Sequence, residues 1–385
     1  MIKLRSIPTK NTQKLRVIVV GGSLGGLCAA LALRHIGCNV EVFERSPQEM
    51  IDRGAGLVMQ LELIHFLENY GIATREEVSV SSSIRQFLGR DGTVLGQQPS
   101  HQLMTSWGAI YRRLKAAFPH ERYHYAHKLV HFEPTQERVK FFLANGCEEV
   151  CDLLVCADGA HSTCRYQLLP DVVPHYAGYV AWRGVIDETQ ISPEVAEVLA
   201  DKFTFFNSPS TQMLCYLIPG ETGENEIGKR RFNWVWYWQV REGEELRDVL
   251  TDRTGLFRDY SIPQGSIRPE LVEQQRTIAQ KILPEVFQHL FAQTKEPFIQ
   301  PIYDLSVPKM AFGRVCLLGD AAFVPRPHTA ASTAKAAEDA MGLAKFIQIH
   351  QGNILKALTA WEKPQLEFGY YLQALGIRLG NSIFR

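Results

Sequence analysis

The sequence predicts an α/β protein in which a helix-covered parallel sheet is interleaved with a second, mostly antiparallel sheet. Three short apolar runs, each leading into a Gly/Asp or Gly/Ser turn, indicate buried parallel strands. They are Arg16 to Val20, Asp152 to Cys156 and Val315 to Leu318, and they lie far apart along the chain. Between the second and third runs, alternating apolar residues are typical of antiparallel strands.

Length and composition exclude several classes of partner. The 385 residues suffice for two domains or one large interleaved domain. Lys plus Arg (41) equals Asp plus Glu (41), so no charge excess indicates nucleic acid or an anionic membrane. The chain has no run of 18 apolar residues, so we expect no stable membrane association. Eight scattered cysteines without a nearby ligand set predict no metal site and a reduced, cytoplasmic protein.

The first run opens a nucleotide-binding pattern. A glycine turn follows it, then a small apolar helix from Leu24, then a strand from Asn39 to Phe43 that closes with Glu44. This is the order of the Rossmann motif, in which a pyrophosphate meets the helix N-terminus and the acid binds a ribose hydroxyl. Gly21 permits the tight turn and Gly26 permits close helix packing, whereas Ser23 replaces the usual middle glycine. The alternative is a glycine turn without a nucleotide.

The other two runs end in similar polar turns. Asp158 and Gly159 follow the second run, with Ser162 and Arg165 at the spacing DG-x-x-S-x-x-R. Gly319 and Asp320 follow the third run and precede an alanine-rich helix. A carboxylate at a strand's carboxyl end suits binding of a sugar hydroxyl. The alternatives are a simple turn with Ser162 as N-cap, and simple helix capping by Asp320.

Together the three segments resemble the class A flavoprotein aromatic hydroxylases, the para-hydroxybenzoate hydroxylase superfamily, over nearly the whole chain. Tyr176 to Gly184, Pro325 to His328 and the Ser23 variant are most similar to the dihydroxypyridine 3-hydroxylase subgroup. The resemblance implies a Rossmann-like FAD-binding domain of the glutathione-reductase type and a mostly antiparallel β-sheet substrate domain. We expect the FAD-binding domain in 15–78, 103–172 and 297–350, the substrate domain in 79–102 and 173–296, and C-terminal helices in 351–385.

The resemblance also implies how FAD is held. Gly21, Ser23 and Gly26 face the pyrophosphate, Glu44 the adenosine ribose, and Asp320 the ribityl chain. Asp158 and Gly159 lie at the crevice between the flavin and a transiently bound nicotinamide. Pro327 packs near the isoalloxazine ring, and backbone N–H groups around its N1/O2 edge stabilise negative charge. The remaining cofactor-binding candidates are Gly22, Leu24, Arg45, Gly319, Ala331, Ser332 and Thr333.

Three positions depart from the family pattern. Phe323 replaces a histidine after the Gly-Asp-Ala-Ala turn, and 329–332 reads Thr-Ala-Ala-Ser instead of a glycine-rich turn. Trp107 takes the place of an FAD-contacting arginine in an Arg-x-x-Leu helix.

The substrate half carries a stripe of large aromatic residues. From Arg231 to Val240, one face of a strand holds Phe232, Trp234, Trp236 and Trp238. We predict that this face packs under helices, the alternative being direct stacking on substrate. Thr204 to Phe206 and Met213 to Ile218 are the expected neighbouring strands.

Four residues are candidates for the substrate pocket. Gln212 is the best positional match for the family's substrate-orienting residue, although glutamine cannot act as a general base. Gln60 and the Pro327-His328 pair are the others, with helix-start and capping roles as alternatives. Arg183 is predicted to be a structural ion-pair partner.

The implied activity is FAD-dependent monooxygenation. NAD(P)H and O2 are consumed to hydroxylate an electron-rich aromatic or N-heteroaromatic small molecule through a flavin C4a-hydroperoxide, in a possible homodimer. One alternative is a flavin-dependent halogenase, since Trp234-x-Trp236 is similar to a tryptophan motif of that group. The other is a flavin-binding protein without turnover. Finally, Pro364 predicts that the tail from Asn353 to Leu379 forms two short helices.

Overall fold

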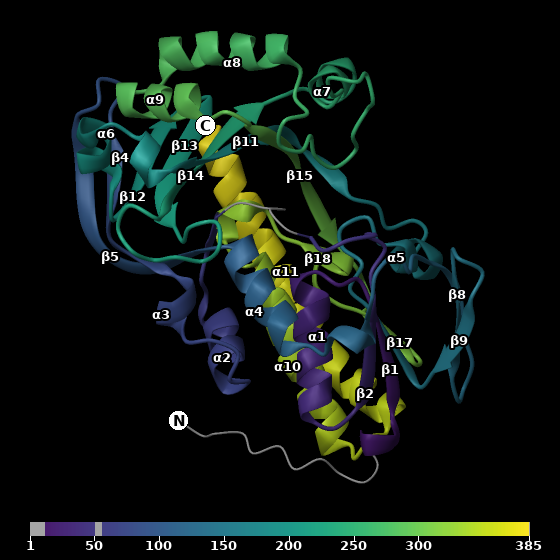
Figure 1. Ribbon diagram of the computed structural model, residues 1–385. Helices are drawn as coiled ribbons and strands as arrows, with labels where there is room; N and C mark the ends of the chain where they lie inside the picture. Colours follow the sequence, from purple (N-terminus) through teal and green to yellow (C-terminus); the bar gives the residue numbers. More distant parts are fainter. Residues whose placement is uncertain (1–11, 51–55, 385) are drawn as a thin grey trace.

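The computed structural model describes residues 12–50 and 56–384, and within them two large sheets share the chain. Figure 1 shows the parallel sheet at the lower right and the antiparallel sheet at the upper left, joined by long central helices. The mixed α/β fold class predicted from the sequence is confirmed. Gly54 and Ala55, which precede Gly56 in the chain, lie outside the described residues.

The first sheet is six-stranded, in the order β16-β17-β10-β1-β2-β6, and is parallel except for β16. β1, β10 and β17 are neighbours although they come from the three distant apolar runs. Their carboxyl ends therefore lie at one edge of the sheet, where the three polar turns meet. The strands are β1 (Arg16–Val20), β2 (Asn39–Phe43), β6 (Tyr123–His124), β10 (Leu153–Cys156), β16 (Ala311–Phe312) and β17 (Val315–Leu317).

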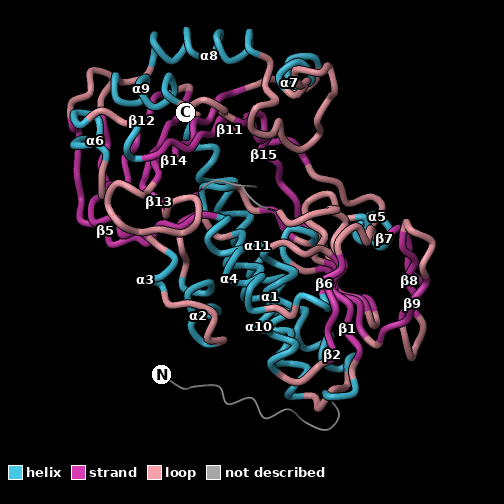
Figure 2. Tube along the Cα trace, in the orientation of Figure 1, coloured by secondary structure: helices cyan, strands magenta, loops and turns pink. Residues whose placement is uncertain are grey.

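Helices cover one side of this sheet and a small sheet lies on its other side. Figure 2 shows α1, α4 and α10 gathered beside β1 and β2, with β8 and β9 opposite. The small alanine side chains of α1 and α10 are buried, which lets the two helices pack closely. The covering helices are α1 (Leu24–His35), α4 (Trp107–Ala117) and α10 (Ser332–Ile349), and the small sheet is β7 (Leu129–Pro134), β8 (Val139–Leu143) and β9 (Glu148–Cys151). α5 (Thr163–Leu168) contacts β7, while α2 (Leu61–Asn69) contacts α10 and the short α3 (Arg75–Val78).

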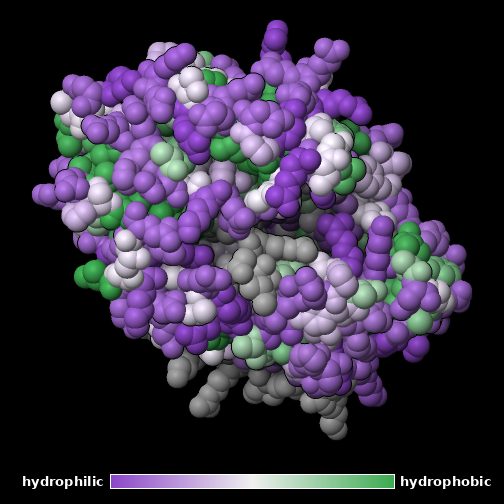
Figure 3. All heavy atoms as spheres, turned by 45° about the horizontal axis from the view of Figure 1, so that its top comes forward, coloured by the Kyte–Doolittle hydropathy of each residue, from purple (hydrophilic) through white to green (hydrophobic). Residues whose placement is uncertain are grey.

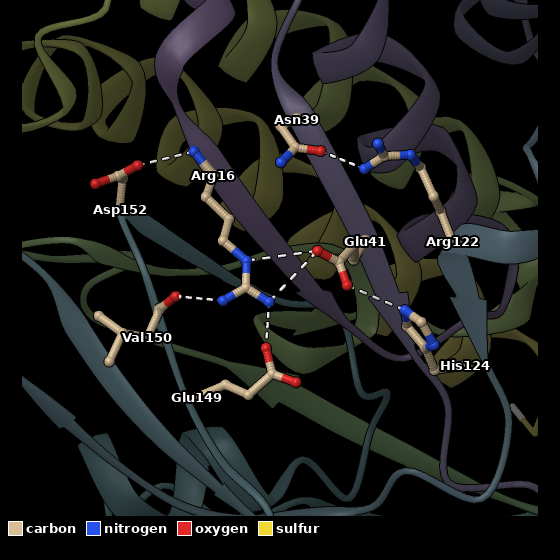
Figure 4. Close-up of polar contacts among 8 residues, drawn as sticks. All are labelled: Arg16, Asn39, Glu41, Arg122, His124, Glu149, Val150 and Asp152. Carbon is tan, nitrogen blue, oxygen red and sulfur yellow. Dashed lines mark hydrogen bonds and ion pairs between the residues drawn. The ribbon is translucent and has the colours of Figure 1, made fainter.

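Polar contacts fasten the end of the parallel sheet that lies away from the three turns. Arg16 begins β1 and donates to Glu41 of β2, Glu149 and the Val150 carbonyl of β9, while Asp152 accepts its backbone N–H (Figure 4). These residues tie strands from distant parts of the sequence together at the strands' amino ends.

The second sheet has nine strands in the order β18-β15-β11-β14-β13-β12-β4-β5-β3, antiparallel except for the β12–β4 pair. The predicted hairpin is present, because β12 and β13 pair through a turn at 209–210. β3, β15 and β18 join this sheet although their residues fall in ranges assigned to the FAD-binding domain. The strands are β3 (Gly56–Val58), β4 (Val80–Leu88), β5 (Val94–Ser106), β11 (His175–Asp187), β12 (Lys202–Ser208), β13 (Thr211–Ile218), β14 (Arg231–Gln239), β15 (Phe298–Ser306) and β18 (Phe323–Val324).

The two faces of this sheet have different roles. Trp234 and Trp236 are fully buried on the outer face and contact Phe291 of α9, so the predicted packing under helices is confirmed. On the inner face, β11 and β14 place Tyr179, Arg183 and Tyr237 toward the FAD-binding part. The outer helices are α6 (Pro193–Leu199), α7 (Glu244–Val249), α8 (Pro269–Ile282) and α9 (Glu285–Gln293), and the 3₁₀ turns are η1 (Thr12–Lys14), η2 (His120–Arg122), η3 (Glu188–Gln190), η4 (Gly319–Ala321) and η5 (Pro327–Thr329).

The C-terminal tail corrects one prediction. Instead of two short helices it forms a single helix, α11 (Ile354–Ile383), with Pro364 inside. Proline removes one backbone hydrogen bond, but tertiary contacts hold the helix on both sides of it. Before it, Trp361 is fully buried and donates to the Asp339 carbonyl; beyond it, Asn381 binds Arg326. None of the described helices combines the length and hydrophobicity of a membrane-spanning segment.

Candidate active site

The glycine turn after β1 has the geometry that a closely approached phosphate requires. Gly21 has a φ of +98°, and a Cβ there would lie 2.3 Å from the Ala157 carbonyl oxygen. A Cβ on Gly26 would lie 1.8 Å from the Gly21 oxygen, so helix α1 rests directly on the turn. Only glycine fits at these two positions, for the two reasons predicted from the sequence.

The N-terminus of α1 points its free backbone N–H groups out of this turn. Ser23 is the N-cap residue, yet its hydroxyl makes no capping hydrogen bond. The hydroxyl is therefore available to an anion at the helix N-terminus, where the helix dipole also favours negative charge. Leu24 can contribute only its backbone, because its side chain is buried in the core.

Glu44 lies at the end of β2 beside the turn. Its carboxylate accepts the backbone N–H of Gly22 at 2.7 Å and that of Ser46 at 2.7 Å. It thus stiffens the turn as well as standing where the motif places a ribose. Arg45 follows at the exposed surface; burial lowers the pKa of His161 to about 4, and the charges of Arg165 and Arg45 add to that effect.

The Asp-Gly turn after β10 is tied into helix α5. Asp158 accepts the Ser162 hydroxyl at 2.5 Å and the Cys164 N–H at 3.2 Å, while Ser162 caps α5 by accepting the Arg165 N–H. Burial raises the pKa of Asp158, and the Ser162 hydrogen bond opposes that rise. Gly159, at φ +84°, supplies the left-handed conformation of the turn.

The Gly-Asp turn after β17 presents a carboxylate that has few protein partners. Asp320 accepts one hydrogen bond, from the Ser332 hydroxyl at 2.5 Å. The surrounding protein desolvates the carboxyl and raises its pKa, although the residue is exposed to solvent. The turn itself is held from below, since the Gly319 N–H donates to Asp339 at 3.0 Å.

A buried ion pair supports this turn. Asp339 bonds Lys335 one helical turn earlier in α10, and both side chains are almost completely buried. Lys335 also lies over the Phe323 ring at 5.2 Å. Phe323, where the family pattern has histidine, is therefore a packing residue. The sequence offered only the i, i+4 spacing as a signal for the pair.

The segment 327–333 leads into α10 and includes its first two residues. Pro327 begins a 3₁₀ turn, Ala330 has a left-handed φ of +52°, and Ala331 is the N-cap. The N–H groups of Ser332 and Thr333 therefore lie at the N-terminus of an 18-residue helix and can stabilise negative charge, whereas the Ala331 N–H donates to the Thr329 hydroxyl at 3.3 Å.

These segments fit FAD. The three turns meet at one sheet edge, two helix N-termini accompany them, and Gly21 and Gly26 leave no room for side chains. Glu44, Asp158 and Asp320 present hydroxyl-binding carboxylates along that edge. This combination suits a pyrophosphate, a ribose and a polyhydroxyl chain.

Opposite these turns, the inner face of the second sheet meets the 3₁₀ turn through His328. The His328 Nε2 lies 2.8 Å from the Tyr179 hydroxyl, and its ring centroid lies 4.4 Å from that of Tyr237. Burial and then the Arg326 charge lower the pKa of His328 to about 3, so the imidazole is neutral near pH 7. Asp304 accepts three hydrogen bonds from Arg326, at 2.7, 2.9 and 3.2 Å. His328 contacts the sheet and does not cap α10.

The two glutamine candidates lie on different elements, Gln212 on β13 and Gln60 at the start of α2. Gln212 is opposite Tyr237 in the sheet register, so it shares the inner face, and its amide donates to Asn207 at 2.8 Å. Gln60 is the N-cap residue of α2 without a capping hydrogen bond, and it is partly buried. Both are compatible with polar pocket positions, and their roles stay predictions.

Arg183 and Asn233, two residues of the inner face, each carry a buried polar atom without a hydrogen bond. No carboxylate among the described residues lies within ion-pair distance of Arg183, so the predicted ion pair is not found there, and the Arg183 Nε is buried without a hydrogen bond. Asn233 is completely buried on the neighbouring strand, and its Nδ2 also lacks a partner. The period-two pattern that marked the tryptophans could have placed both residues on the opposite face.

Trp107, which takes the place of an arginine in the family pattern, stacks on Tyr111 with the two ring centroids 4.7 Å apart.

Among the described residues no three side chains gather as metal ligands. All eight cysteines are free, and seven of them are buried.

Comparisons with known proteins agree with the geometry. Residues 176–304 match a family described as FAD binding domain-like, and residues 16–85 match the pyridine nucleotide-disulphide oxidoreductases. The chain is 37% identical to 2,6-dihydroxypyridine 3-monooxygenase of Paenarthrobacter nicotinovorans, over 92% of this chain and 88% of that protein. It is 26% identical to 6-hydroxynicotinate 3-monooxygenase of Pseudomonas fluorescens, over 88% and 83%.

The structural comparison gives the same result. The structure of 2,6-dihydroxypyridine-3-hydroxylase from Arthrobacter nicotinovorans superposes with a TM-score of 0.91 at 34% identity, covering 96% of this chain and 92% of that one. These relatives support neither the halogenase nor the non-catalytic alternative. The chain thus belongs to the FAD-dependent aromatic hydroxylases, monooxygenases that use FAD, a pyridine nucleotide and O2.

Proposed function

We propose that this enzyme hydroxylates a small N-heteroaromatic ring that carries at least one hydroxyl group, with hydroxypyridines as the first candidates. The observation that carries the proposal is the inner face around Tyr179, Tyr237 and His328, which offers polar groups within an aromatic wall. Such a wall binds a flat ring, and its few polar groups select ring hydroxyls and nitrogens. The relatives named for dihydroxypyridine and hydroxynicotinate support the same class.

The chain's own residues hold the cofactor and the ring. Bound FAD supplies the redox chemistry, with electrons from NAD(P)H and oxygen from O2. Ser23 and the α1 N-terminus would bind its pyrophosphate, Asp320 its ribityl hydroxyls, and the α10 N-terminus the negative charge that develops on its ring. The inner face of the nine-stranded sheet would exclude water from the reacting ring carbon.

The substrate candidates orient the ring without removing a proton. Gln212 can donate or accept a hydrogen bond but cannot take a proton at neutral pH. His328 is neutral, and its Nε2 is hydrogen-bonded to the Tyr179 hydroxyl, so either side chain of the pair can form a further hydrogen bond with a ring hydroxyl. Pro327 lies beside His328 in the 3₁₀ turn, and Gln60 lies near the edge strand β3. Their positions favour orientation over acid–base chemistry.

The test is NAD(P)H oxidation by the FAD-loaded enzyme with a panel of hydroxypyridines, hydroxynicotinates and phenols, together with product analysis. We expect a hydroxypyridine to accelerate oxidation most and to yield a product with one added oxygen. A panel in which no ring accelerates NAD(P)H oxidation contradicts the proposal, and faster oxidation with phenols alone contradicts the substrate class.

A cytoplasmic location and a homodimer stay predictions. Free cysteines at all eight positions suit a reducing compartment. The face in Figure 3 is mostly hydrophilic with small, separate hydrophobic patches, so a dimer would bury a different surface or a polar one. Sedimentation of the FAD-loaded protein measures the oligomeric state directly.

A further inference from the structure

The inner face holds two hydrogen-bond donors that the protein leaves unused. Arg183 of β11 forms no hydrogen bond or ion pair with any described residue, and its Nε is buried. Asn233 of β14 is completely buried, and its Nδ2 has no partner. Buried donors are almost always satisfied in proteins, and a guanidinium without a carboxylate costs more than a neutral group. Two such donors together indicate a ligand.

The sheet register brings these donors together. Val235 is opposite Arg183 and Asn233 is opposite Val185, so Arg183 and Asn233 are diagonal neighbours on one face. Diagonal neighbours in antiparallel strands lie about 7–8 Å apart at their backbones, within reach of a long side chain. A single ligand oxygen can therefore accept from both.

The orientation of the Asn233 amide is fixed by the protein. Its Oδ1 accepts the Gly56 N–H at 2.8 Å, which only an oxygen can do, so its NH2 group points elsewhere. Gly56 begins β3, and a Cβ there would lie 2.7 Å from both Asn233 and Tyr216. The donor is thus held rigidly, as a binding site requires.

The surroundings are aromatic and carry no negative charge among the described residues. The Arg183 charge opposes the rise that burial causes in the pKa of Tyr216 and Tyr237, which places both phenols close to the guanidinium. Tyr237 in turn contacts His328, at the start of the segment that leads into α10. The unused donors therefore lie on the side of the sheet that faces the FAD-binding turns.

We propose that Arg183 and Asn233 bind the deprotonated hydroxyl oxygen of the ring substrate, so that the enzyme selects the anionic form of a hydroxylated heteroaromatic. The inference rests on the proposed function and supplies what Gln212 and His328 lack. With no base among the described pocket residues, a fixed positive charge favours the ionised ring by binding it. Ionisation makes the ring electron-rich at the carbons that accept oxygen.

The test is equilibrium binding of 2,6-dihydroxypyridine to the oxidised, FAD-loaded enzyme without NAD(P)H. Changes in the flavin absorbance report binding, and the ligand's own absorbance reports whether it is bound as anion. For the wild type we expect the bound ligand to show the anion spectrum. The apparent Kd should rise about tenfold for each pH unit below the pKa of the ligand, because protonation depletes the form that binds.

The groups that face Arg183 do not titrate in the range of this experiment. Burial raises the pKa of Tyr179 and Tyr216 and brings that of Tyr237 to about 12, while that of His328 is about 3. Between pH 5 and 9 the described neighbours keep one protonation state, so the pH dependence belongs to the ligand.

Three variants separate charge from shape. Arg183→Gln should raise the Kd about tenfold to a hundredfold at a pH where the ligand is ionised, as expected for a lost charge-assisted hydrogen bond. Arg183→Lys should restore part of this loss, because it returns the charge without the planar fork. Asn233→Asp keeps the Gly56 contact but places a carboxylate beside Arg183, so it should weaken binding at least as much as Arg183→Gln.

Controls use the ligand and the same sheet face. 2,6-Dimethoxypyridine cannot ionise, so its binding should not change in Arg183→Gln. Arg85 of β4 also carries a buried, unpaired Nε but lies four strands away over Phe203 and Phe205, so Arg85→Gln should bind the anion normally. FAD content and thermal unfolding establish that each variant is folded.

The outcomes distinguish the inference from the function beneath it. If wild-type enzyme turns over 2,6-dihydroxypyridine and Arg183→Gln binds it equally well, still as the anion, the inference is wrong and the function stands. Binding of the neutral form by the wild type overturns the inference as well. If no hydroxypyridine or hydroxynicotinate of the panel changes the flavin spectrum or stimulates NAD(P)H oxidation by the wild type, the proposed function is rejected and the inference with it.

Discussion

Asp320 and Asp158 both follow a strand at the cofactor edge, yet the structure predicts that removing each carboxylate impairs a different property. Asp320 has one protein partner, the Ser332 hydroxyl, and is free to bind a ribityl hydroxyl. Asp158 is already occupied by Ser162 and by the N–H of Cys164. We therefore expect Asp320→Ala to impair FAD binding and Asp158→Ala to impair stability.

The magnitudes follow from these contacts. A hydrogen bond to a charged group contributes about 1.5–3 kcal/mol, so Asp320→Ala should raise the Kd for FAD by about 10- to 150-fold. The FAD-free variant should be no less stable than wild type, because burial and the nearby charge of Asp339 disfavour the ionised Asp320 carboxyl. Asp158→Ala leaves a buried hydroxyl and a buried N–H without partners, which costs roughly 1–3 kcal/mol of folding stability.

The assay combines two measurements on FAD-free protein. Quenching of flavin fluorescence on titration gives the Kd, and thermal unfolding gives the stability. The variants Asp320→Asn and Asp158→Asn keep the side-chain shape, so they test charge alone and should show smaller effects in the same directions. Equal losses of FAD affinity in Asp320→Ala and Asp158→Ala would refute the reasoning, as would a marked loss of stability in Asp320→Ala.

Four further predictions use other parts of the structure. Gly26→Ala should abolish FAD binding or folding, whereas Gly96→Ala, with open space at its Cβ and no positive φ, should behave as wild type in both FAD titration and unfolding. The pKa of His328 is lowered from 6.5 to about 3, so wild-type stability should fall as the pH drops below 6.5, by at most about 2 kcal/mol between pH 7.5 and 5, and His328→Asn should flatten this dependence in chemical denaturation. Pro364→Ala should raise the unfolding temperature, since it restores a helix hydrogen bond, and an unchanged or lower value would contradict that account. Gln212→Leu should lower the ratio of product to NAD(P)H consumed and release hydrogen peroxide with normal FAD content; unchanged coupling and substrate affinity would show that Gln212 does not contact the ring.

The cofactor edge could be predicted from the sequence because its determinants are local. Gly21 and Gly26 are required by a turn only a few residues long, and the strand before them is a continuous apolar run. Asp158 and Asp320 could be placed because each directly follows such a strand. Parallel strands that are buried on both faces carry this signal wherever they occur in the chain.

The tail could not be predicted in the same way. Pro364 is a strong local signal for a break, but the helix is held by residues distant in sequence. Glu362 accepts the backbone N–H groups of Met310 and Ala311, and Gly380 lies against Tyr179 and Arg326. Tertiary contacts of this kind override a local preference of a few kcal/mol, and no pattern within the helix announces them.

The ion pair predicted for Arg183 is not found among the described residues, and the reason differs from that for the tail. An arginine in a mostly apolar strand has two physical solutions, an anionic partner from the protein or an anionic group of a ligand. The sequence contains 41 acidic residues, so the first solution was the natural expectation. Among the described residues, Asp304 pairs with Arg326 and Glu188 with Arg230, and no acid pairs with Arg183. A partly buried cation that the described residues leave unpaired, beside the unused amide of the buried Asn233, is better explained by a partner that arrives with the substrate.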